Sequence, residues 1–535
     1  MFFHKKSNNK KKKNDQENNQ PDISKEAYSE TVLAEMQLST SLAHNAEMVK
    51  KVVGGNFDLV SRYFTLGRIE TVNAAVFYFD NMLDPKQVDS NIMQPMIVGS
   101  YSSGLVKGTE IVSEICSGNI ITRTEIKTAR NMKELTDGIL EGDVLLLIDG
   151  TAESHVISVK GYNYRNIKES EVEPTVKGTR DSFVEVLNVN IGLIRRRIKS
   201  PNLIFEPMKI GRVTQTNICI SYIRGICPPN LIDEVRSRIE KIDIDGVLGS
   251  NYIEEFIVDE PFSIFPQIRN TERPDVASAA LLEGRAVIFV DNTPVTLIVP
   301  GELFSLLQSS EDYFNAYIFS SVLRILRFIA LAIALTLPSF YIAIVNFHQE
   351  LIPTRLLVSI TSARTGVPFP NFAEALLMEA TFEILREAGV RLPRPVGPAV
   401  SIVGGLVIGQ AAVQASVVSP LMVIVVSLTA ISAFTIPQYN ISLSIRLIRF
   451  GLMMLSAILG LYGMMLGILF LLLHLCSIRS FGTPYLAPLA PFNLNDNKDT
   501  FIRAPFWMLK NRPSNISYNK KRMPSDQMPE PPEEE

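Results

Sequence analysis

The chain has 535 residues, of which 46% are hydrophobic and 20% are charged, and its formal net charge is −3. This length exceeds one ordinary hydrophobic core, so at least two domains are expected, while so small a net charge points to no particular partner. The four cysteines and five histidines are scattered without metal-ligand spacing, which argues against a zinc site or a disulfide framework and fits a reducing compartment.

Residues 1–30 begin with a tract rich in lysine and asparagine. The tract lacks the apolar segment of a secretory signal peptide. Its composition predicts a solvated, disordered tail. The alternative is a weak attraction of Lys10 to Lys13 to an anionic membrane surface.

Two segments of the soluble half share one layout. The first runs from Ile69 to Lys160, and the second runs from Val213 to Pro300. Each starts with a β-branched and aromatic strand and ends with Leu-Glu-Gly, an apolar strand, a turn containing aspartate and a return strand. We therefore predict two related α/β subdomains, at residues 31–200 and 201–310. Chance similarity of strand–turn–strand patterns is the alternative.

A linker helix is predicted at the end of the first subdomain. One apolar stripe follows helical spacing, at Phe183, Leu187, Ile191, Ile194 and Ile198. Arg195, Arg196 and Arg197 crowd its last turns, where cations suit the helix dipole. The functional hypothesis is a contact with another subunit or with an acidic partner. The alternative is a capped core helix with a solvated basic end.

The soluble half shows no constellation that carries chemistry. It contains no P-loop, no dinucleotide-binding fingerprint, no nucleophile elbow and no zinc-protease motif. We therefore predict no catalytic residue, no bound cofactor and no metal site, and we expect that the protein is not an enzyme.

Residues 311–480 have the composition of an all-α, polytopic membrane domain. Four spans are predicted, at about 328–347, 396–418, 421–436 and 450–476. The first is a run of about 20 residues without formal charge, enough to cross a hydrocarbon core of about 30 Å. Because Arg324 and Arg327 precede this span, the positive-inside rule places the soluble half in the cytoplasm. Arg446, Arg449 and Arg479 flank the fourth span, and the polar, acidic tail at 481–535 is expected to be disordered.

A charged helix is predicted among these apolar segments, at residues 371–391. Its polar side carries Glu379, Glu383, Arg386 and Glu387. A helix with this face would lie at the membrane interface or form a re-entrant segment, with its acidic side toward water or another subunit. Such glutamates could form rings that favour cations when several subunits surround an axis. The alternative is a surface helix with internal pairs such as Glu387–Arg391.

The second predicted span is thin and partly polar. Gly405 and Gly409 have GxxxG spacing, which lets another helix approach closely. Gln410 and Gln414 lie one turn apart on one face, where lipid is a poor environment for them. They would either hydrogen-bond across helices or form a wall that faces water.

Three long segments resemble blocks of the GerA family, the A subunits of spore germinant receptors. They are VPFPNFAEALLMEATFEILREAGVRLPRPVGPAVSIVGGLVIGQAAVQASVVSP, FVEVLNVNIGLIRRRIKSPNL and LEGRAVIFVDNTPVTLIVP. The resemblance covers the chain from about Leu33 to Ser480 in the family's order and spacing. It leaves out the lysine-rich start and the region beyond Ser480.

The resemblance implies a receptor subunit with two α/β subdomains in the inner membrane of dormant bacterial endospores. Its partners would be a transporter-like B subunit, a lipoprotein C subunit, membrane lipids and further copies of itself, with no nucleic acid. The complex would respond to a nutrient and release cations, and the A subunit would oligomerise into a channel. Glu379, Glu383, Glu387, Gln410 and Gln414 are then our pore candidates. A non-conducting scaffold and a transporter subunit remain as alternatives.

Overall fold

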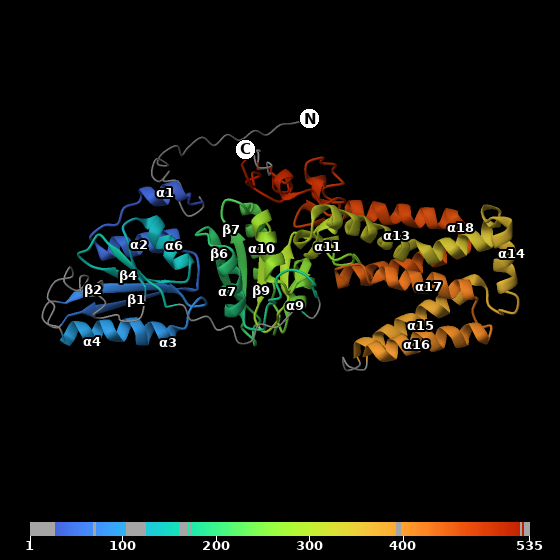
Figure 1. The fold of residues 1–535 in the computed structure, drawn as a ribbon, viewed down its shortest axis with the longest axis horizontal. Helices are drawn as coiled ribbons and strands as arrows, with labels where there is room; N and C mark the ends of the chain where they lie inside the picture. Colours follow the sequence, from blue (N-terminus) through green and yellow to red (C-terminus); the bar gives the residue numbers. More distant parts are fainter. Residues whose placement is uncertain are drawn as a thin grey trace, which may run out of the picture.

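The computed structural model of this chain describes residues 27–67, 71–102, 125–159, 170, 173–391, 397–524 and 527–528. Figure 1 shows an elongated molecule in which two α/β subdomains and a helical region follow one another along the long axis. The predicted disordered tail at 1–30 lies almost entirely outside the described residues.

The first subdomain is a five-stranded antiparallel sheet in the order β1-β2-β4-β5-β3. Its elements are α1 (Glu30–Glu35), α2 (Leu42–Val52), β1 (Leu59–Leu66), β2 (Val72–Phe79), α3 (Pro85–Val88), the π-helix η2 (Asp89–Met93), α4 (Gln94–Ser102), β3 (Ile126–Ala129), α6 (Met132–Leu140), β4 (Val144–Ile148) and β5 (Ser154–Ile157). Helices α2 and α6 cover one face, and α3 to α4 cover the other. Because both faces are covered, β4 is an unbroken apolar run whose residues are all buried.

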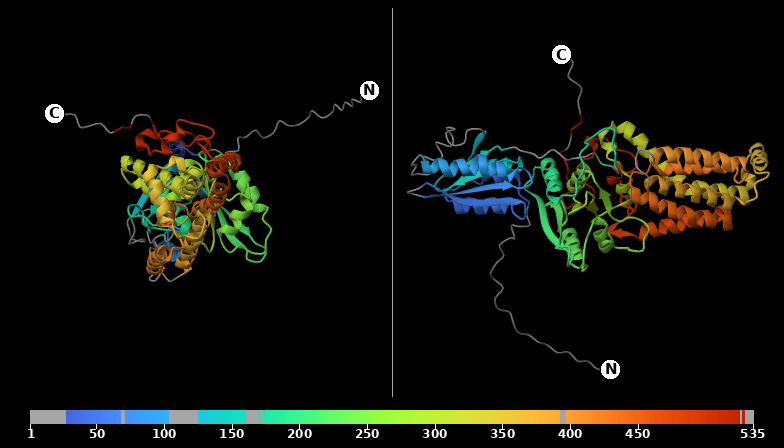
Figure 2. Two further views of the ribbon diagram at one scale, coloured as in Figure 1. Left: turned by 90° about the vertical axis from the view of Figure 1, so that its right-hand side faces the viewer. Right: turned by 90° about the horizontal axis from the view of Figure 1, so that it is seen from below.

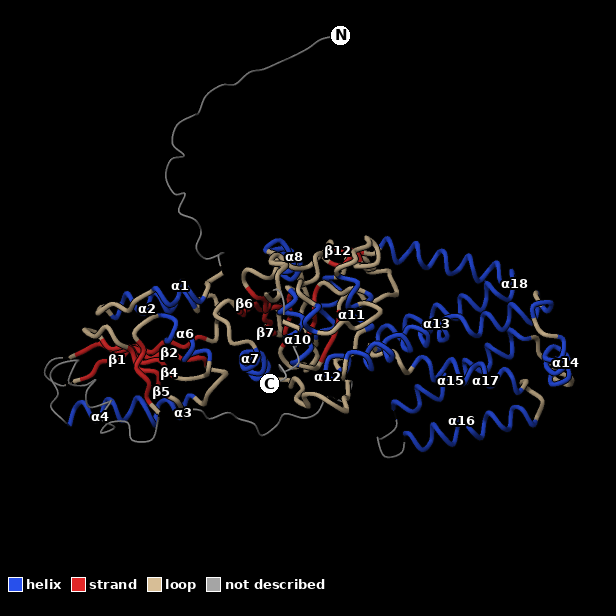
Figure 3. The backbone as a smooth tube through the Cα atoms, turned by 45° about the horizontal axis from the view of Figure 1, so that its top comes forward, coloured by secondary structure: helices blue, strands red, loops and turns tan. Residues whose placement is uncertain are grey.

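The second subdomain repeats this architecture, with the strand order β6-β7-β9-β10-β8. Its elements are α7 (Leu187–Arg197), β6 (Leu203–Ile210), β7 (Thr216–Ile223), α8 (Pro229–Glu240), α9 (Ser250–Ile257), β8 (Arg269–Thr271), α10 (Pro274–Glu283), β9 (Ala286–Val290) and β10 (Thr296–Val299). Figure 3 shows the two sheets as separate groups of strands. Helices α7 and α10 cover one face of the second sheet, and α8 and α9 cover the other.

The likeness of the two subdomains extends to single hydrogen bonds. The carboxylate of Asp149 accepts from the backbone N–H of Leu42 at 3.0 Å, where α2 begins. The carboxylate of Asp291 accepts from the backbone N–H of Leu187 at 3.2 Å, where α7 begins. In both cases the aspartate follows an apolar strand and satisfies a backbone donor that a helix N-terminus leaves unpaired.

Helix α7 is therefore the counterpart of α2 and belongs to the second subdomain. The predicted boundary at residue 200 placed it with the first. Its apolar stripe packs into the core between α10 and the second sheet, in contact with residues such as Phe205 and Phe289. The sequence shows the apolar stripe itself. It does not show that the stripe packs on the sheet that comes after it in the chain, and not on the sheet that comes before it.

Two short helices, α11 (Leu303–Leu307) and α12 (Glu311–Phe314), lead from the second subdomain into the helical region. Against them packs the C-terminal segment, which contains β11 (Arg479–Ser480), β12 (Thr483–Pro484) and the 3₁₀-helices η4 (Asp496–Asp499) and η5 (Phe506–Met508). The carboxylate of Asp499 accepts from Arg324 at 2.9 Å and from the Tyr313 hydroxyl at 2.7 Å. The expectation of a disordered tail is wrong for this segment, because buried ionic and aromatic contacts hold it.

The helical region comprises α13 (Tyr317–Phe347), the 3₁₀-helix η3 (Gln349–Leu351), α14 (Thr354–Ala363), α15 (Asn371–Arg391), α16 (Gly397–Gln414), α17 (Pro420–Ala433) and α18 (Tyr439–Ser477). By length and composition, α13 and α18 are long and apolar enough to cross a membrane. Helix α17 is shorter and mainly apolar. Helix α15 carries the charged residues and occupies the range predicted for them.

Helix α18 reverses direction at Gly460. This residue has φ 62° and ψ −143°, a conformation that is essentially open only to glycine. A β-carbon at Gly463 would lie 2.3 Å from the carbonyl oxygen of Leu455, eight residues earlier. In a continuous helix eight residues rise about 12 Å, so residues 439–459 and 461–477 run antiparallel. The single span predicted at 450–476 is therefore wrong: the glycine divides it.

The helices run back and forth between two ends. At the near end, beside the second subdomain, Ser263 Oγ lies 3.0 Å from His474 Nε2 and Gln438 donates to Glu173 at 3.0 Å. At the far end α14 caps the bundle, as Figure 2 shows. Helix α13, helices α15 to α17 and the two halves of α18 connect these ends in alternating directions, which returns the chain to the near end.

Candidate functional site

Helix α15 is fixed at the far end by a buried carboxylate. The side chain of Glu374 is fully enclosed. It accepts from the backbone N–H and the hydroxyl of Ser419, each at 3.0 Å, and from Arg364 at 2.9 Å. These bonds tie the start of α15 to the end of α14 and to the N-terminus of α17, where Ser419 is the capping residue.

Five and nine residues further along, α15 presents two carboxylates to the first half of α18. Arg449 lies 2.9 Å from Glu379 and 3.5 Å from Glu383, and Arg446 lies 2.8 Å from Glu383. Arg386 completes the cluster at 3.8 Å from Glu383. Glutamates four residues apart on one helix thus meet arginines three residues apart on the other, the spacings that place side chains on one helical face.

The ionic cluster lies well inside the bundle, and Glu383, whose side chain is 25% exposed, is its most accessible member. Glu379 and Arg449 are each only 1% exposed. Arg449 is ten residues from the start of α18, so the cluster lies about 15 Å from the near end at 1.5 Å per residue. The guanidinium of Arg386 stacks over Phe434 with 5.0 Å to the ring centre.

Positive charge predominates in this cluster, which holds three arginines and two glutamates. The Nε and Nη1 of Arg449 are buried without a hydrogen-bond partner among the described residues. In the sequence, Arg446 and Arg449 are predicted only as charges that flank a span. Their three-residue spacing, matched to the four-residue spacing of the glutamates, was the available signal for a pairing of α15 with α18.

The pore candidates separate into two groups. Glu379 and Glu383 face α18 and not open water, because the arginines of α18 pair with them; the expectation of a water-facing acidic row is corrected for these two. Glu387 is 63% exposed and pairs with Arg391 at 2.7 Å. Gln410 and Gln414 are exposed on α16.

The glycines of the GxxxG pair differ in surroundings. A β-carbon at Gly409 would lie 3.7 Å from Val423 of α17, so this glycine faces a neighbouring helix. A β-carbon at Gly405 would meet nothing within 4 Å, and the residue is exposed. Helix α16 therefore presents an outer surface that the described chain leaves uncovered.

Arg195 of α7 joins the two subdomains instead of projecting outward. Arg195 donates to both carboxylate oxygens of Asp58, at 2.5 and 2.7 Å, and both side chains are buried. Its guanidinium lies 3.7 Å from the ring centre of Phe79 and 4.7 Å from that of Phe205. The hypothesis of a contact with another subunit is therefore wrong for Arg195. Arg197 pairs with Asp181 at 2.6 Å, and Arg196 is half-buried.

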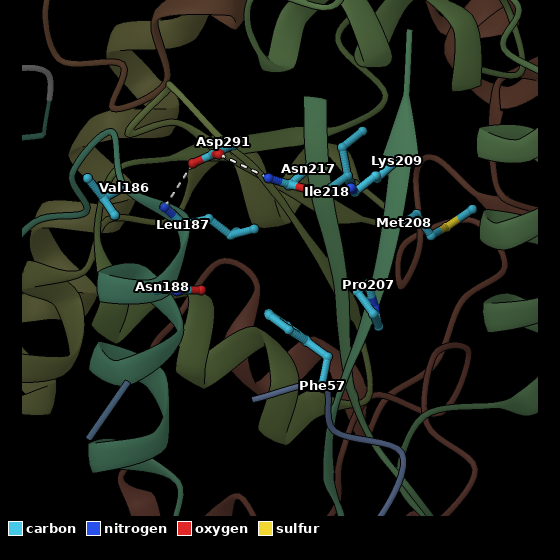
Figure 4. A pocket seen from close by; sticks show the side chains of 10 residues that line it. All are labelled: Phe57, Val186, Leu187, Asn188, Pro207, Met208, Lys209, Asn217, Ile218 and Asp291. Carbon is cyan, nitrogen blue, oxygen red and sulfur yellow. Dashed lines mark hydrogen bonds between the residues drawn. The ribbon is translucent and has the colours of Figure 1, made fainter. Parts of the chain in front are cut away.

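A crevice of about 550 Å³ opens beside this joint. Figure 4 shows Phe57 of the first subdomain facing the start of α7 and strands β6 and β7. The Asp291 carboxylate at its edge is already engaged by Leu187 and Asn217. Within the described residues, no group of three or more His, Cys, Asp or Glu side chains is arranged to hold a metal ion.

Comparisons with known proteins match most of the chain to one protein family. The family model described as Bacillus/Clostridium GerA spore germination protein matches residues 47–515. Spore germination protein KA of Bacillus subtilis (strain 168) is 45% identical, over 92% of this chain and 90% of that protein. Spore germination protein A1 of the same organism is 39% identical, over 88% and 95%. The crystal structure of the N-terminal domain of the A subunit of the Bacillus megaterium spore germinant receptor GerK3 aligns with 49% of this chain and 95% of that one, at 34% identity and a TM-score of 0.40.

Proposed function

Because this chain belongs to the GerA family of spore germination proteins, we propose that it is the A subunit of a nutrient germinant receptor. The family match carries this proposal, because it includes the α/β subdomains, the helical region and most of the C-terminal segment. In this role the protein acts by transmitting a signal and not by catalysis. Its partners are a transporter-like B subunit and a lipoprotein C subunit.

The helical region is proposed to lie in the spore inner membrane as a polytopic domain. Two apolar helices, and the reversal of the second at Gly460, support repeated crossing of a bilayer. Arg324 and Arg327, at the near end of α13, favour the cytoplasmic side for the near end and hence for both subdomains. An even number of passes keeps the C-terminal segment on that same side, where it packs.

We further propose that copies of the chain associate through α16 and enclose a path for cations. The support is the uncovered outer surface of this helix, where Gly405 leaves room for another backbone and Val407 is 56% exposed. Gln410 and Gln414 supply polar groups beside this apolar surface, and Glu387 supplies negative charge toward the near end.

Reconstitution of the purified full chain into liposomes tests both the association of copies through α16 and the conduction of cations. Gly405→Leu places a side chain on the outer surface of α16, so it is expected to reduce both oligomer mass and potassium flux. Gly451→Leu is the matched control, because a β-carbon at Gly451 also meets nothing within 4 Å. Equal mass and flux in the two variants would refute association through α16, although membership in the family would be unaffected.

A non-conducting scaffold is the second candidate function, and the ionic cluster favours it. Glu379 and Glu383 are carboxylates that a cation path could use, yet arginines of the same chain pair with them. In that case the cluster would transmit movement between α15 and α18. Liposomes that contain correctly assembled oligomers without potassium flux would support the scaffold over the channel.

A further inference from the structure

A second cavity, of about 530 Å³, lies at the junction of the second subdomain, the α11–α12 connection and the C-terminal segment. A volume of this size suits a small organic molecule. Helix α10 forms one wall, Tyr313 and Phe314 of α12 form another, and Phe506, Arg512 and Arg522 close it from the C-terminal segment. It is separate from both the crevice beside Arg195 and the ionic cluster.

Two arginines that line this cavity form no direct ion pair with a carboxylate of the described residues. Arg269 makes a long hydrogen bond of 3.5 Å to the carbonyl of Gln308, and its Nε is buried without a partner among the described residues. The charge of Glu173 acts on Arg269 from beyond ion-pair distance. Arg512 donates to backbone carbonyls, including that of Leu282 at 2.7 Å, and forms no ion pair within the described chain. Both side chains are only partly exposed, and neither pairs directly with a carboxylate among the described residues, so both positions suit an anion.

The acids near the cavity are already engaged elsewhere. Glu283 lies 3.5 Å from both Arg285 and Arg522, and Arg285 also pairs with Glu302 at 3.0 Å. The positive charge of Arg512 is thus left uncompensated. Consistent with this, burial and then the nearby charge of Arg522 lower the pKa of Arg512.

One part of the lining is apolar or aromatic. Val276, Ala279 and Ala280 of α10 contribute to it together with Phe314 and Phe506, while Gln308, Ser309 and Ser310 add uncharged polar groups. A ligand that fits both parts of the lining therefore carries an anionic group at one end and an apolar or aromatic body at the other.

We propose that this cavity binds a small organic anion, whose carboxylate or phosphate contacts Arg269 and Arg512 and whose apolar body packs between α10 and Phe506. The binding is independent of whether an oligomer conducts ions. Planar guanidinium groups suit both carboxylate and phosphate oxygens, which accept two hydrogen bonds from one arginine.

The site is placed to affect the first long helix. Tyr313 lines the cavity and donates to Asp499 at 2.7 Å, and the same carboxylate pairs with Arg324 of α13 at 2.9 Å. A ligand in contact with Tyr313 is thus two hydrogen bonds from α13.

The single tryptophan of the chain, Trp507, follows Phe506 directly and packs edge-to-face against Tyr317, so its fluorescence reports on the cavity wall. Phenyl phosphate is the probe, and it is titrated into the full chain in neutral detergent. We expect a saturable change in fluorescence, which benzyl alcohol does not produce. Inorganic phosphate is expected to bind more weakly, because it lacks the apolar body.

Substitutions of residues that line the cavity test whether the fluorescence change arises from binding in this cavity. Loss of one hydrogen bond to a charged group corresponds to roughly a tenfold to hundredfold loss of affinity, which we expect for Arg269→Gln and for Arg512→Gln. Arg212→Gln is the matched control, since Arg212 is exposed, outside the cavity, and its change alters the net charge equally. Ala279→Phe fills the cavity while leaving all arginines, so it tests the site if an arginine variant fails to fold.

Three results would overturn the proposal. They are the absence of a saturable response to phenyl phosphate, undiminished affinity in the cavity variants, and inorganic phosphate binding as tightly as phenyl phosphate. Titration in nanodiscs distinguishes a soluble anion from a lipid headgroup. If phosphatidylglycerol nanodiscs abolish the binding that neutral-lipid nanodiscs retain, the site holds a lipid and the assignment to a soluble anion is wrong.

Discussion

Replacement of Arg195 by methionine is expected to loosen the joint between the two α/β subdomains. Methionine keeps much of the volume between the rings of Phe79 and Phe205 but removes the guanidinium that both rings contact. The buried carboxylate of Asp58 then keeps one side-chain donor, Asn81 at 2.8 Å, in place of three hydrogen bonds. Its negative charge is no longer compensated.

The magnitude follows from that uncompensated charge. Removal of one partner from a buried ion pair costs about 3–5 kcal/mol, because the remaining charge stays desolvated. Because the pair spans the joint, we expect the penalty to fall on opening of the joint more than on either sheet. A loss of about 3 kcal/mol in local opening corresponds to roughly a hundredfold faster amide exchange.

Hydrogen exchange of the full chain measures this directly. The backbone N–H of Phe205 donates across the joint to the Asn56 side chain at 2.8 Å, so its protection reports on the joint. Strand β4, buried within the first sheet, serves as the internal reference. Arg197→Met is the matched control, since its pair with Asp181 is only partly buried. If exchange at Phe205 is the same in both variants, the buried pair does not hold the subdomains together.

Three further predictions concern other parts of the chain. Gly460→Ala should destabilise the helical region by about 2 kcal/mol or more, because its φ of 62° combined with its ψ of −143° suits almost only glycine and the new carbon would lie 3.0 Å from Phe347. The melting temperature checks this prediction. Gly451→Ala is the control, because a β-carbon there lies in open space, and it should leave the melting temperature unchanged. Equal melting temperatures of the two variants would refute the reversal at Gly460. Burial lowers the pKa of His155 below 6.5, so the unfolded chain binds the proton first and the free energy of unfolding should fall as the pH drops below about 6.5. Calorimetry should show a flatter pH dependence in His155→Leu, and an unchanged slope would contradict this assignment. Asp499→Asn should weaken the packing of the C-terminal segment against the rest of the chain by about 1–3 kcal/mol, because the buried Arg324 loses a carboxylate partner. Limited proteolysis should then cut that segment faster, and wild-type resistance would mean that other contacts suffice.

The α/β repeat was accessible from sequence because it depends on local signals. Apolar strands and turns at Asp149 and Asp291 recur at matching positions, and these aspartates perform the same capping task in both copies. The boundary between the copies depends on which sheet α7 covers. That choice is tertiary, and no local signal in the stripe from Phe183 to Ile198 distinguishes the two sheets.

The helical region shows where local signals are insufficient. The charged face of α15 was visible as a pattern, but a helical pattern does not say what lies opposite. Here the partners are Arg446 and Arg449, about 65 residues further along, and only the fold brings them together. Gly460 lies in an apolar run with several other glycines, so its sequence context did not distinguish a reversal from a continuous span.

The composition of the ionic cluster constrains where a cation path could run. A surface with three arginines and two glutamates would favour anions if it faced water, because arginine-lined constrictions repel cations. The proposed path therefore runs along the outer surface of α16, where Gln410 and Gln414 are uncharged. The cluster then has a mechanical role, because it fastens α15 to α18. Since α18 begins and ends against the second subdomain, through Gln438 and His474, a movement of that subdomain would reach the α15–α16 hairpin through the buried ion pairs.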